Sequence, residues 1–272
     1  MKTIILATDF SPAALNAANY ATGLAKAIGA DLLLFHAFYL FVTYTDVPPL
    51  ADPEELKENA QSSIDQLRKQ LKDKYGNSLN IKTEVRMGTF VTQLESLCES
   101  IKPYAVVMGS QGSSATDYRF FGSQTVLAMK QLSWPVIAVP SGAKFTAVKK
   151  IALACDLENV LAHTPVHEIK NLVKDFHVEL HILNTNKEKN FDPKMVAESG
   201  LLIRLFTPIQ PEYHFITSEN IDEGIIDFCE MNRIDLLIVI PKRHNLLDKL
   251  IHKSHTKRLV LQSHTPIVAL HE

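Results

Sequence analysis

The chain is built from two copies of one sequence pattern. Residues 4–9 read Ile-Ile-Leu-Ala-Thr-Asp, and residues 151–156, which lie 147 positions later, read Ile-Ala-Leu-Ala-Cys-Asp. Residues 135–139 (Pro-Val-Ile-Ala-Val) and 266–270 (Pro-Ile-Val-Ala-Leu) match in the same way at an offset of 131. The smaller second offset means that the first copy carries extra residues in its middle. The repeat predicts two tandem units, over 1–142 and 147–272.

Each copy alternates short apolar runs with helical patterns. The runs of the first copy are nearly continuous and rich in Val, Ile and Leu, which predicts strands buried on both faces of a parallel sheet: 3–8, 31–38, 80–86, 104–108 and 135–139. Helices are predicted between them: from Ser11-Pro12 to Gly29, over 53–74, after Thr89 and over 123–132. This order predicts two tandem open parallel five-stranded sheets with helices on both faces.

Composition excludes several function classes. The net charge of −2 argues against a broad, charge-driven nucleic-acid binder. No apolar stretch approaches the ~20 residues of a membrane-spanning helix, and Asp9 ends the first apolar run too early for a secretory leader. The three cysteines form no CxxC pair, which disfavours a disulfide framework or a cysteine zinc site and fits a cytoplasmic protein.

The candidate ligand-binding stretch follows the fourth strand of the first copy. It holds Gly109, Gly112 and Gly122, three of the chain's 10 glycines, and Ser123 comes directly before a predicted helix. Ligands of open α/β sheets bind at such strand-to-helix junctions, where glycine lets the backbone approach a phosphate and helix N–H groups favour anions. The spacing matches neither the P-loop nor the dinucleotide fingerprint. The alternative is a flexible connection with ordinary turn glycines.

With these residues the sequence resembles the universal stress protein (UspA-like) family in its tandem two-domain form. Nucleotide-binding members of that family carry Gly, two residues, Gly, nine residues, Gly and then Ser or Thr, and Gly109-x2-Gly112-x9-Gly122-Ser123 fits without a gap. The stretches Ala7-Thr8-Asp9-Phe10-Ser11, Phe35-His36-Ala37 and Trp134-Pro135-Val136-Ile137-Ala138-Val139 are similar to the family as well.

The resemblance implies a Rossmann-like fold of the adenine nucleotide alpha hydrolase-like kind, with ATP or another adenine nucleotide, with or without Mg²⁺, at the carboxyl edge of the first sheet. Read on its own chemistry, Asp9 can accept from ribose hydroxyls, face a magnesium ion, or cap the helix near Ser11. The family pattern implies that Thr8, Asp9 and Ala37 flank the adenine and ribose, that Met108 and Gly109 line the ribose, and that Gly112, Gly122, Ser123, Gln124 and Thr125 hold the phosphates.

The second copy departs from this pattern. At the 131 offset, Ile240, Arg243 and Lys253 replace the three glycines, and Pro241 lacks an N–H donor. Asp156 and Ser254 are retained. We therefore expect no ATP in the second copy, whose role would be structural, supplying the surface that a second protomer supplies in single-domain relatives.

Ten of the 11 histidines lie at or after position 163. The basic, histidine-rich stretch 242–264 is either an anion or metal patch or a solvated helix face. His163 and His167 have the i, i+4 spacing that places two imidazoles on one helical face, but no third ligand is evident nearby. No metal site and no set of catalytic residues is therefore predicted.

Three functions remain. The first, which we expect, is an ATP-binding stress-response regulator that forms a homodimer or an intramolecular pseudo-dimer. The second is a slow ATPase or self-phosphorylating enzyme using Asp9, Asp117 or Arg119, which lack a catalytic triad, lysine or metal cluster around them. The third is a nucleotide-free interaction module in which 135–140 and 266–270 are sheet edges that pair. The insertion around 39–53 would be a lid or an interface loop.

Overall fold

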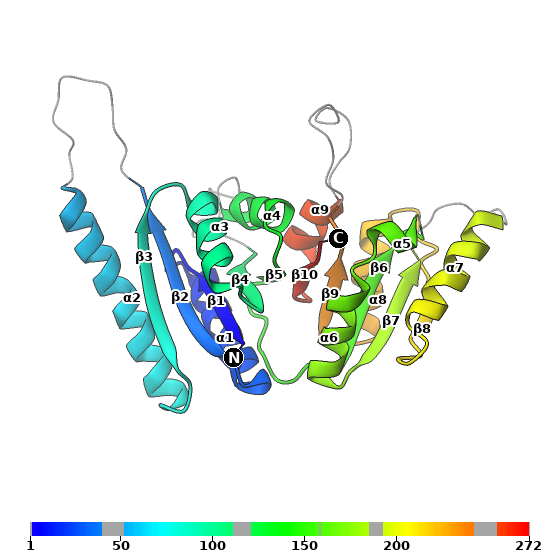
Figure 1. Cartoon of the computed structure of the whole chain (residues 1–272), viewed down its shortest axis with the longest axis horizontal. Helices are drawn as coiled ribbons and strands as arrows, with labels where there is room; N and C mark the ends of the chain where they lie inside the picture. Colours follow the sequence, from blue (N-terminus) through cyan, green and yellow to red (C-terminus); the bar gives the residue numbers. More distant parts are fainter. Residues whose placement is uncertain are drawn as a thin grey trace, which may run out of the picture.

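The computed structural model describes residues 2–39, 52–110, 121–157, 159–184, 193–241 and 255–271. The first half alternates strands and helices as the sequence predicts (Figure 1). Its elements are β1 (Thr3–Ala7), α1 (Pro12–Ile28), β2 (Asp31–Phe38), α2 (Pro53–Tyr75), β3 (Ile81–Met87), α3 (Phe90–Ile101), β4 (Ala105–Gly109), α4 (Phe121–Gln131) and β5 (Val136–Val139).

The second half repeats this order with one additional short helix. Its elements are β6 (Lys150–Cys155), α5 (Val160–His163), α6 (Val166–Phe176), β7 (Glu179–Asn184), α7 (Pro193–Leu205), β8 (Glu212–Phe215), α8 (Ile221–Met231), β9 (Leu236–Val239), α9 (His255–Gln262) and β10 (Ile267–Ala269). No described helix is both long enough and apolar enough to span a bilayer.

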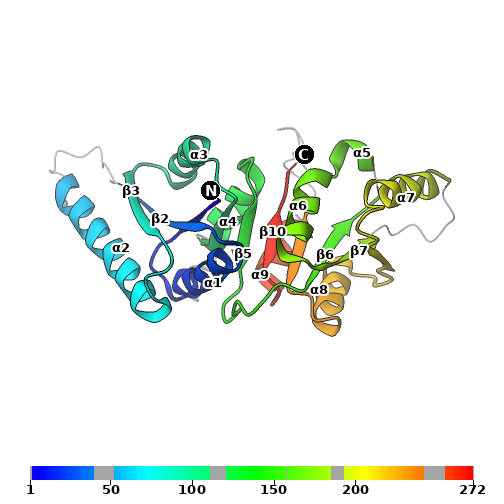
Figure 2. The ribbon, with the colours of Figure 1, turned by 60° about the horizontal axis from the view of Figure 1, so that its bottom comes forward.

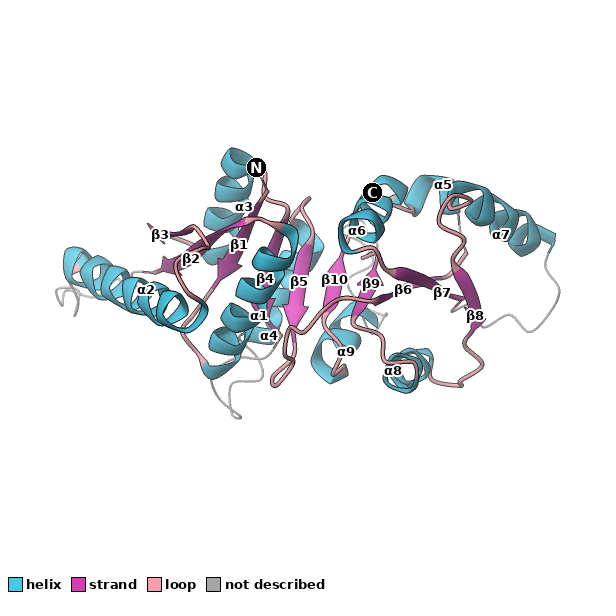
Figure 3. Ribbon diagram, turned by 90° about the horizontal axis from the view of Figure 1, so that it is seen from below, coloured by secondary structure: helices cyan, strands magenta, loops and turns pink. Residues whose placement is uncertain are grey.

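Each half contains the predicted open parallel sheet, and the two sheets are joined. Within the described residues the strands form one ten-stranded sheet in the order β3-β2-β1-β4-β5-β10-β9-β6-β7-β8. All pairs are parallel except β5 with β10, which run antiparallel and lie side by side at the centre of the molecule (Figure 3). The edge strands that the sequence marked as suited to pairing therefore pair with each other within one chain.

Two apolar cores cover the two faces of this sheet. Successive residues of β1 alternate between them, with Ile4 and Leu6 in one and Ile5 and Ala7 in the other, as the period of a strand requires. Helices α1, α2, α5, α6 and α7 pack on the first face, and α3, α4, α8 and α9 on the second. Contacts of α1 with α6 and of α4 with α9 continue both helical layers across the junction (Figure 2).

The ends of α1 follow directly from its sequence. Ser11 is the N-cap, and its hydroxyl accepts a hydrogen bond from the backbone N–H of Ala14 at 3.2 Å. Gly29 ends the helix in the left-handed region, at φ 63°. Thr89 occupies the N-cap position of α3, as predicted, but its side chain makes no capping hydrogen bond.

The segment that joins the halves is held against α1. The Asn16 side-chain amide donates to the carbonyls of Pro140 and Ala143, each at 3.0 Å. Phe145 stacks edge-on against Tyr20 with ring centroids 5.3 Å apart. A Cβ on Gly23 would come within 2.7 Å of the Phe145 ring, so the glycine makes room for this aromatic side chain.

Candidate functional site

A small cavity lies where the carboxyl ends of β1 and β4 meet the start of α1. It is open to solvent, and the unoccupied space at its mouth, open solvent included, is about 270 Å³. Its walls include residues of the first strand end, of the fourth strand end, and of α3 and α4: Ala7, Thr8, Asp9, Ser11, Ala14, Phe90, Met108, Gly109 and Thr125. This is the edge at which an open parallel sheet binds its ligands.

The turn from β1 into α1 is a tight, hydrogen-bonded corner. Thr8 Oγ1 accepts from the Phe10 N–H at 3.0 Å, and Asp9 Oδ1 accepts from both the N–H and the hydroxyl of Ser11, at 3.1 and 2.7 Å. Phe10 has a positive φ of 63°, a strained value for a residue with a bulky side chain, and its ring packs 4.7 Å from that of His36. The corner fixes the Asp9 carboxylate at the cavity wall.

Gly109 ends β4 in close contact with α1. A Cβ at this position would lie 3.0 Å from the backbone carbon and oxygen of Ala13, so a side chain here would push the strand end away from the helix. The Gly109 carbonyl accepts from Thr125 Oγ1 at 2.8 Å, which ties β4 to α4. Glycine is required here by close approach to a helix, and the same approach forms one wall of the cavity.

Two polar atoms beside this wall are without partners. Ser110 is 1% exposed, and among the described residues neither its hydroxyl nor Gln124 Oε1 has a hydrogen-bond partner. Buried polar atoms are rarely left unsatisfied, since each costs about 1–3 kcal/mol. These two residues flank the glycine-rich stretch in the sequence and are the chain neighbours of Gly109 and Thr125, which line the cavity.

The structure brings most of the predicted site residues together. Thr8, Asp9, Met108, Gly109 and Thr125 line the cavity, and Gln124 directly precedes Thr125 in α4. Of the other four, Ala37 lies near the carboxyl end of β2, outside the described residues that line the cavity, and Gly122 and Ser123 belong to the first turn of α4. Gly112 lies outside the described residues, as do Asp117, Arg119 and most of the 39–53 insertion.

The corner recurs in the second half with changed chemistry. Leu157, the counterpart of Phe10, has φ 56°, and its N–H points to Cys155 Sγ at 3.4 Å, where Thr8 stands in the first half. Ile240 and Pro241 follow β9 at the place of Gly109 and Ser110. The other replaced positions, Arg243 and Lys253, and the retained Ser254 lie outside the described residues.

The sequence of the first half matches a known family. The model of the universal stress protein family matches residues 1–140, slightly more than half of the chain. The chain belongs to the universal stress protein family. Universal stress protein MJ0531 of Methanocaldococcus jannaschii is similar to it, with 27% identity over 153 residues that cover 53% of this chain and 84% of that protein.

Solved structures extend the fold of this family member to both halves. A universal stress protein from Archaeoglobus fulgidus superimposes with a TM-score of 0.72 at 18% identity, over 99% of this chain and 96% of that one. A Pseudomonas aeruginosa PAO1 protein of unknown function does so with a TM-score of 0.60 at 10% identity, over 99% and 92%. The tandem architecture is therefore shared by proteins with very different sequences.

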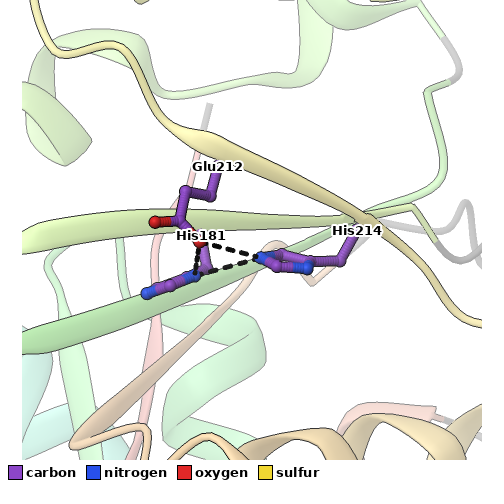
Figure 4. A group of neighbouring side chains, drawn as sticks. All are labelled: His181, Glu212 and His214. Carbon is purple, nitrogen blue, oxygen red and sulfur yellow. Dashed lines mark hydrogen bonds and ion pairs between the residues drawn. The ribbon is translucent and has the colours of Figure 1, made fainter.

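A second polar cluster in this universal stress protein was not predicted. His181 of β7 and Glu212 and His214 of β8 place one ring nitrogen, one carboxylate oxygen and another ring nitrogen within 4.8 Å of one another (Figure 4). His181 is buried, and burial lowers the pKa of its imidazole. The available signal was the Glu-x-His pair, since residues i and i+2 of a strand share a face.

The histidine pair that the sequence did single out is not on one helix. His163 is the last residue of α5, and His167 lies in α6, because Thr164 and Pro165 separate the two helices. The expectation that their imidazoles share one helical face is therefore wrong. Spacing alone could not show this, because i, i+4 places side chains together only where the helix is continuous.

The described part of the histidine-rich stretch, α9, makes polar contacts with Asp222 of α8. His255 Nδ1 lies 2.6 Å from Asp222 Oδ1, and Arg258 Nη1 donates to Asp222 Oδ2 at 3.2 Å. Asp222 is 1% exposed. These contacts join α9 to α8, so at least this histidine takes part in local structure; residues 242–254 of the stretch lie outside the described residues.

Proposed function

We propose that this chain is a stress-response regulator that binds one adenine nucleotide, ATP, in its first half. The observation that carries the proposal is the cavity at the carboxyl ends of β1 and β4, which the Asp9 carboxylate and the Gly109 backbone line together. Asp9 can accept from ribose hydroxyls or face Mg²⁺. The backbone of 109–123 and the start of α4 would hold the phosphates, as helix N-termini do.

The second half supports the first without a nucleotide of its own. Its strand β10 pairs with β5, and α9 contacts α4, the helix that begins at the glycine-rich stretch. Ile240 and Pro241 replace a glycine and a residue with an N–H donor. We propose that this half acts as an intramolecular partner, so that one chain forms the pseudo-dimer that we expected from the paired sheet edges.

The proposal concerns binding rather than turnover. The Ser11 hydroxyl, which donates to Asp9 Oδ1 at 2.7 Å, also accepts from the Ala14 N–H as the N-cap of α1, so this pair is engaged in holding the corner rather than set up as a nucleophile and its base. Steady hydrolysis that is lost in Asp9→Asn would favour the slow ATPase instead. All three cysteines are buried thiols, which fits our proposal of a cytoplasmic protein.

The experiment is nucleotide release followed by titration. Purified protein is denatured, the released nucleotide is quantified by chromatography, and stripped protein is titrated with ATP by calorimetry. We expect one adenine nucleotide per chain and a loss of binding in Gly122→Lys, which imitates Lys253. Gly200→Lys is the matched control, since a side chain at that helical position meets open space.

Each alternative has its own result. Two nucleotides per chain would mean that the second half binds ATP despite Ile240 and Pro241. No bound nucleotide and no ATP binding on titration would leave an interaction module whose glycine pattern serves packing alone. Equal ATP affinity of Gly122→Lys and wild type would also contradict the proposed site.

A further inference from the structure

The cluster of His181, Glu212 and His214 lies far from the proposed nucleotide site. β7 and β8 are at the outer end of the sheet in the second half, whereas the cavity lies between β1 and β4 in the first. His181 pairs with Glu212 across the parallel register, and His214 follows two residues later on the same face of β8. Three potential ligands therefore come from two neighbouring strands with fixed register.

The spacing of the three donor atoms is that of a metal site. His181 Nδ1 lies 3.1 Å from His214 Nε2 and 3.5 Å from Glu212 Oε2, and His214 Nε2 lies 3.7 Å from Glu212 Oε2 (Figure 4). A tetrahedral zinc ion bound at about 2.0–2.2 Å places neighbouring ligand atoms roughly 3.3–3.5 Å apart. The three atoms therefore already form one face of such a tetrahedron.

Hydrogen bonding alone explains this arrangement poorly. One imidazole can donate to the other at 3.1 Å, but the Glu212 oxygen stands 3.5 and 3.7 Å from the two nitrogens, where a hydrogen bond is long or absent. A carboxylate oxygen 3.5 and 3.7 Å from two imidazole nitrogens is the arrangement that a cation shared among the three would produce.

The surroundings of His181 fit coordination through Nδ1. Its side chain is 4% exposed, and among the described residues its Nε2 has no hydrogen-bond partner. Nδ1 coordination puts the ring proton on Nε2, which faces Glu179 Oε2 at 3.9 Å. At 3.9 Å this is an ion-pair distance and not a hydrogen bond, so Glu179 would have to move closer to act as the outer carboxylate that a metal-bound histidine commonly has. Lys150 shares that carboxylate, with its Nζ 3.7 Å from the same oxygen.

We propose that His181, Glu212 and His214 bind one divalent zinc ion on the outer edge of the sheet. Two imidazoles and one carboxylate are a zinc ligand set, and three protein ligands leave a fourth position for water. Glu212 is 65% exposed at its side chain, so that position faces solvent. The ion would tie β8, a four-residue strand at the end of the sheet, to β7.

The test uses the full-length protein, stripped of metal by a chelator and of nucleotide by denaturation and refolding. Zinc is titrated against a competing chromophoric chelator, and cobalt(II) is added separately for its visible spectrum. We expect one tight zinc site per chain and the intense bands of tetrahedral cobalt(II). His214→Gln and Glu212→Gln should each weaken zinc binding by more than about 100-fold, beyond the range typical of losing an outer partner.

Two controls separate this site from other histidines and from the nucleotide. His264→Gln removes an exposed histidine of the same half and should leave zinc affinity unchanged. Gly122→Lys should bind zinc like wild type, because the two sites are in different halves. Since Glu212 is exposed and His214 half-buried, both variants should keep the far-UV circular dichroism of the wild type.

Two results would overturn the proposal. One is wild-type protein without saturable zinc binding at one ion per chain. The other is tight binding that survives both His214→Gln and Glu212→Gln, which would assign the ion to other histidines such as those of 242–264. A zinc-dependent rise in the thermal midpoint that is present in wild type and absent in both variants would add independent support.

Discussion

Asp9 accepts two hydrogen bonds from Ser11 through a single carboxylate oxygen, Oδ1, at 3.1 Å from the backbone nitrogen and 2.7 Å from the hydroxyl. The residue therefore has a structural role at the β1–α1 corner whether or not it also contacts a nucleotide. The two roles can be separated, because an amide oxygen can replace Oδ1 as an acceptor but carries no charge for Mg²⁺.

The first prediction follows from that separation. The free energy of unfolding of Asp9→Asn, measured with denaturant, should stay within about 1 kcal/mol of the wild-type value. Calorimetric titration should show that the variant has lost most of its ATP affinity. Ser11→Ala should have the opposite effect: it should keep most of the ATP affinity but lose about 0.5–2 kcal/mol of stability, because α1 loses its N-cap. Undiminished ATP binding in Asp9→Asn would reduce Asp9 to its role in the corner.

The second prediction concerns Gly109. Gly109→Ala places a Cβ 3.0 Å from the Ala13 backbone, which should cost about 1–3 kcal/mol and displace the cavity wall, lowering ATP affinity. Gly200→Ala is the control, and it should raise the free energy of unfolding by about 0.5–1 kcal/mol. Its Cβ would contact no other atom, and alanine stabilises a helix relative to glycine. Equal stability of the two variants would argue that β4 moves away from α1 without cost.

The third prediction concerns the buried carboxylate of Asp222. Asp222→Asn should lower the free energy of unfolding by about 1.5–3 kcal/mol, because the carboxylate accepts a charge-assisted hydrogen bond from Arg258 and also contacts the His255 ring. Asp227→Asn changes an exposed carboxylate of the same helix and should shift stability by less than about 0.5 kcal/mol. Urea unfolding of both variants compares them directly.

The fourth prediction concerns thiol reactivity. Burial, assisted by neighbouring Glu95 and Glu230, raises the pKa of the Cys98 and Cys229 thiols to about 12 in each case. Very little thiolate exists at neutral pH, so an aromatic disulfide reagent should label these two residues only as fast as the protein unfolds. Mass spectrometry identifies the labelled sites, and rapid modification of either cysteine in native protein would contradict this.

The fifth prediction concerns the centre of the sheet. Val268 of β10 is fully buried and pairs with Ile137 of β5. Val268→Asp buries an uncompensated charge at the junction and should cost more than about 3 kcal/mol. We expect its denaturant unfolding to separate into two transitions, one for each half. Val196→Asp, at an exposed position of α7, should keep the wild-type curve.

The sequence predicts the positions of the inner strands well because those strands are buried on both faces. The expectation of two buried faces is wrong for β3, which is mostly half-buried because it stands at the edge of the sheet. Continuous apolar runs such as 3–8 and 104–108 match β1 and β4 to within a residue at either end, and Ser11 and Gly29 mark the ends of α1 as their chemistry requires. What the runs do not encode is which strand edges meet. From the sequence alone, residues 135–139 are equally suited to pair with the same strand of a second chain or with the second half of this one.

The candidate site was predictable in outline and the cluster of His181, Glu212 and His214 was not. Thr8, Asp9 and Gly109 follow strands that end at one edge of a parallel sheet, so their convergence is dictated by topology. His181 and Glu212 are neighbours only through the β7–β8 register, across 31 positions of sequence that contain α7. That register depends on packing between distant segments rather than on any local pattern.

The antiparallel contact between β5 and β10 is of the kind that relates two identical subunits by a twofold axis. In a symmetric dimer, every substitution is imposed on both sides at once. Here the two sides occupy different stretches of one chain, so each can change alone. This freedom is consistent with the differences between the two copies. Thr8 corresponds to Cys155, and Gly109 corresponds to Ile240, although the surrounding strands and helices match. Covalent linkage of the two copies thus lets the two halves carry unlike residues at matching positions within one molecule.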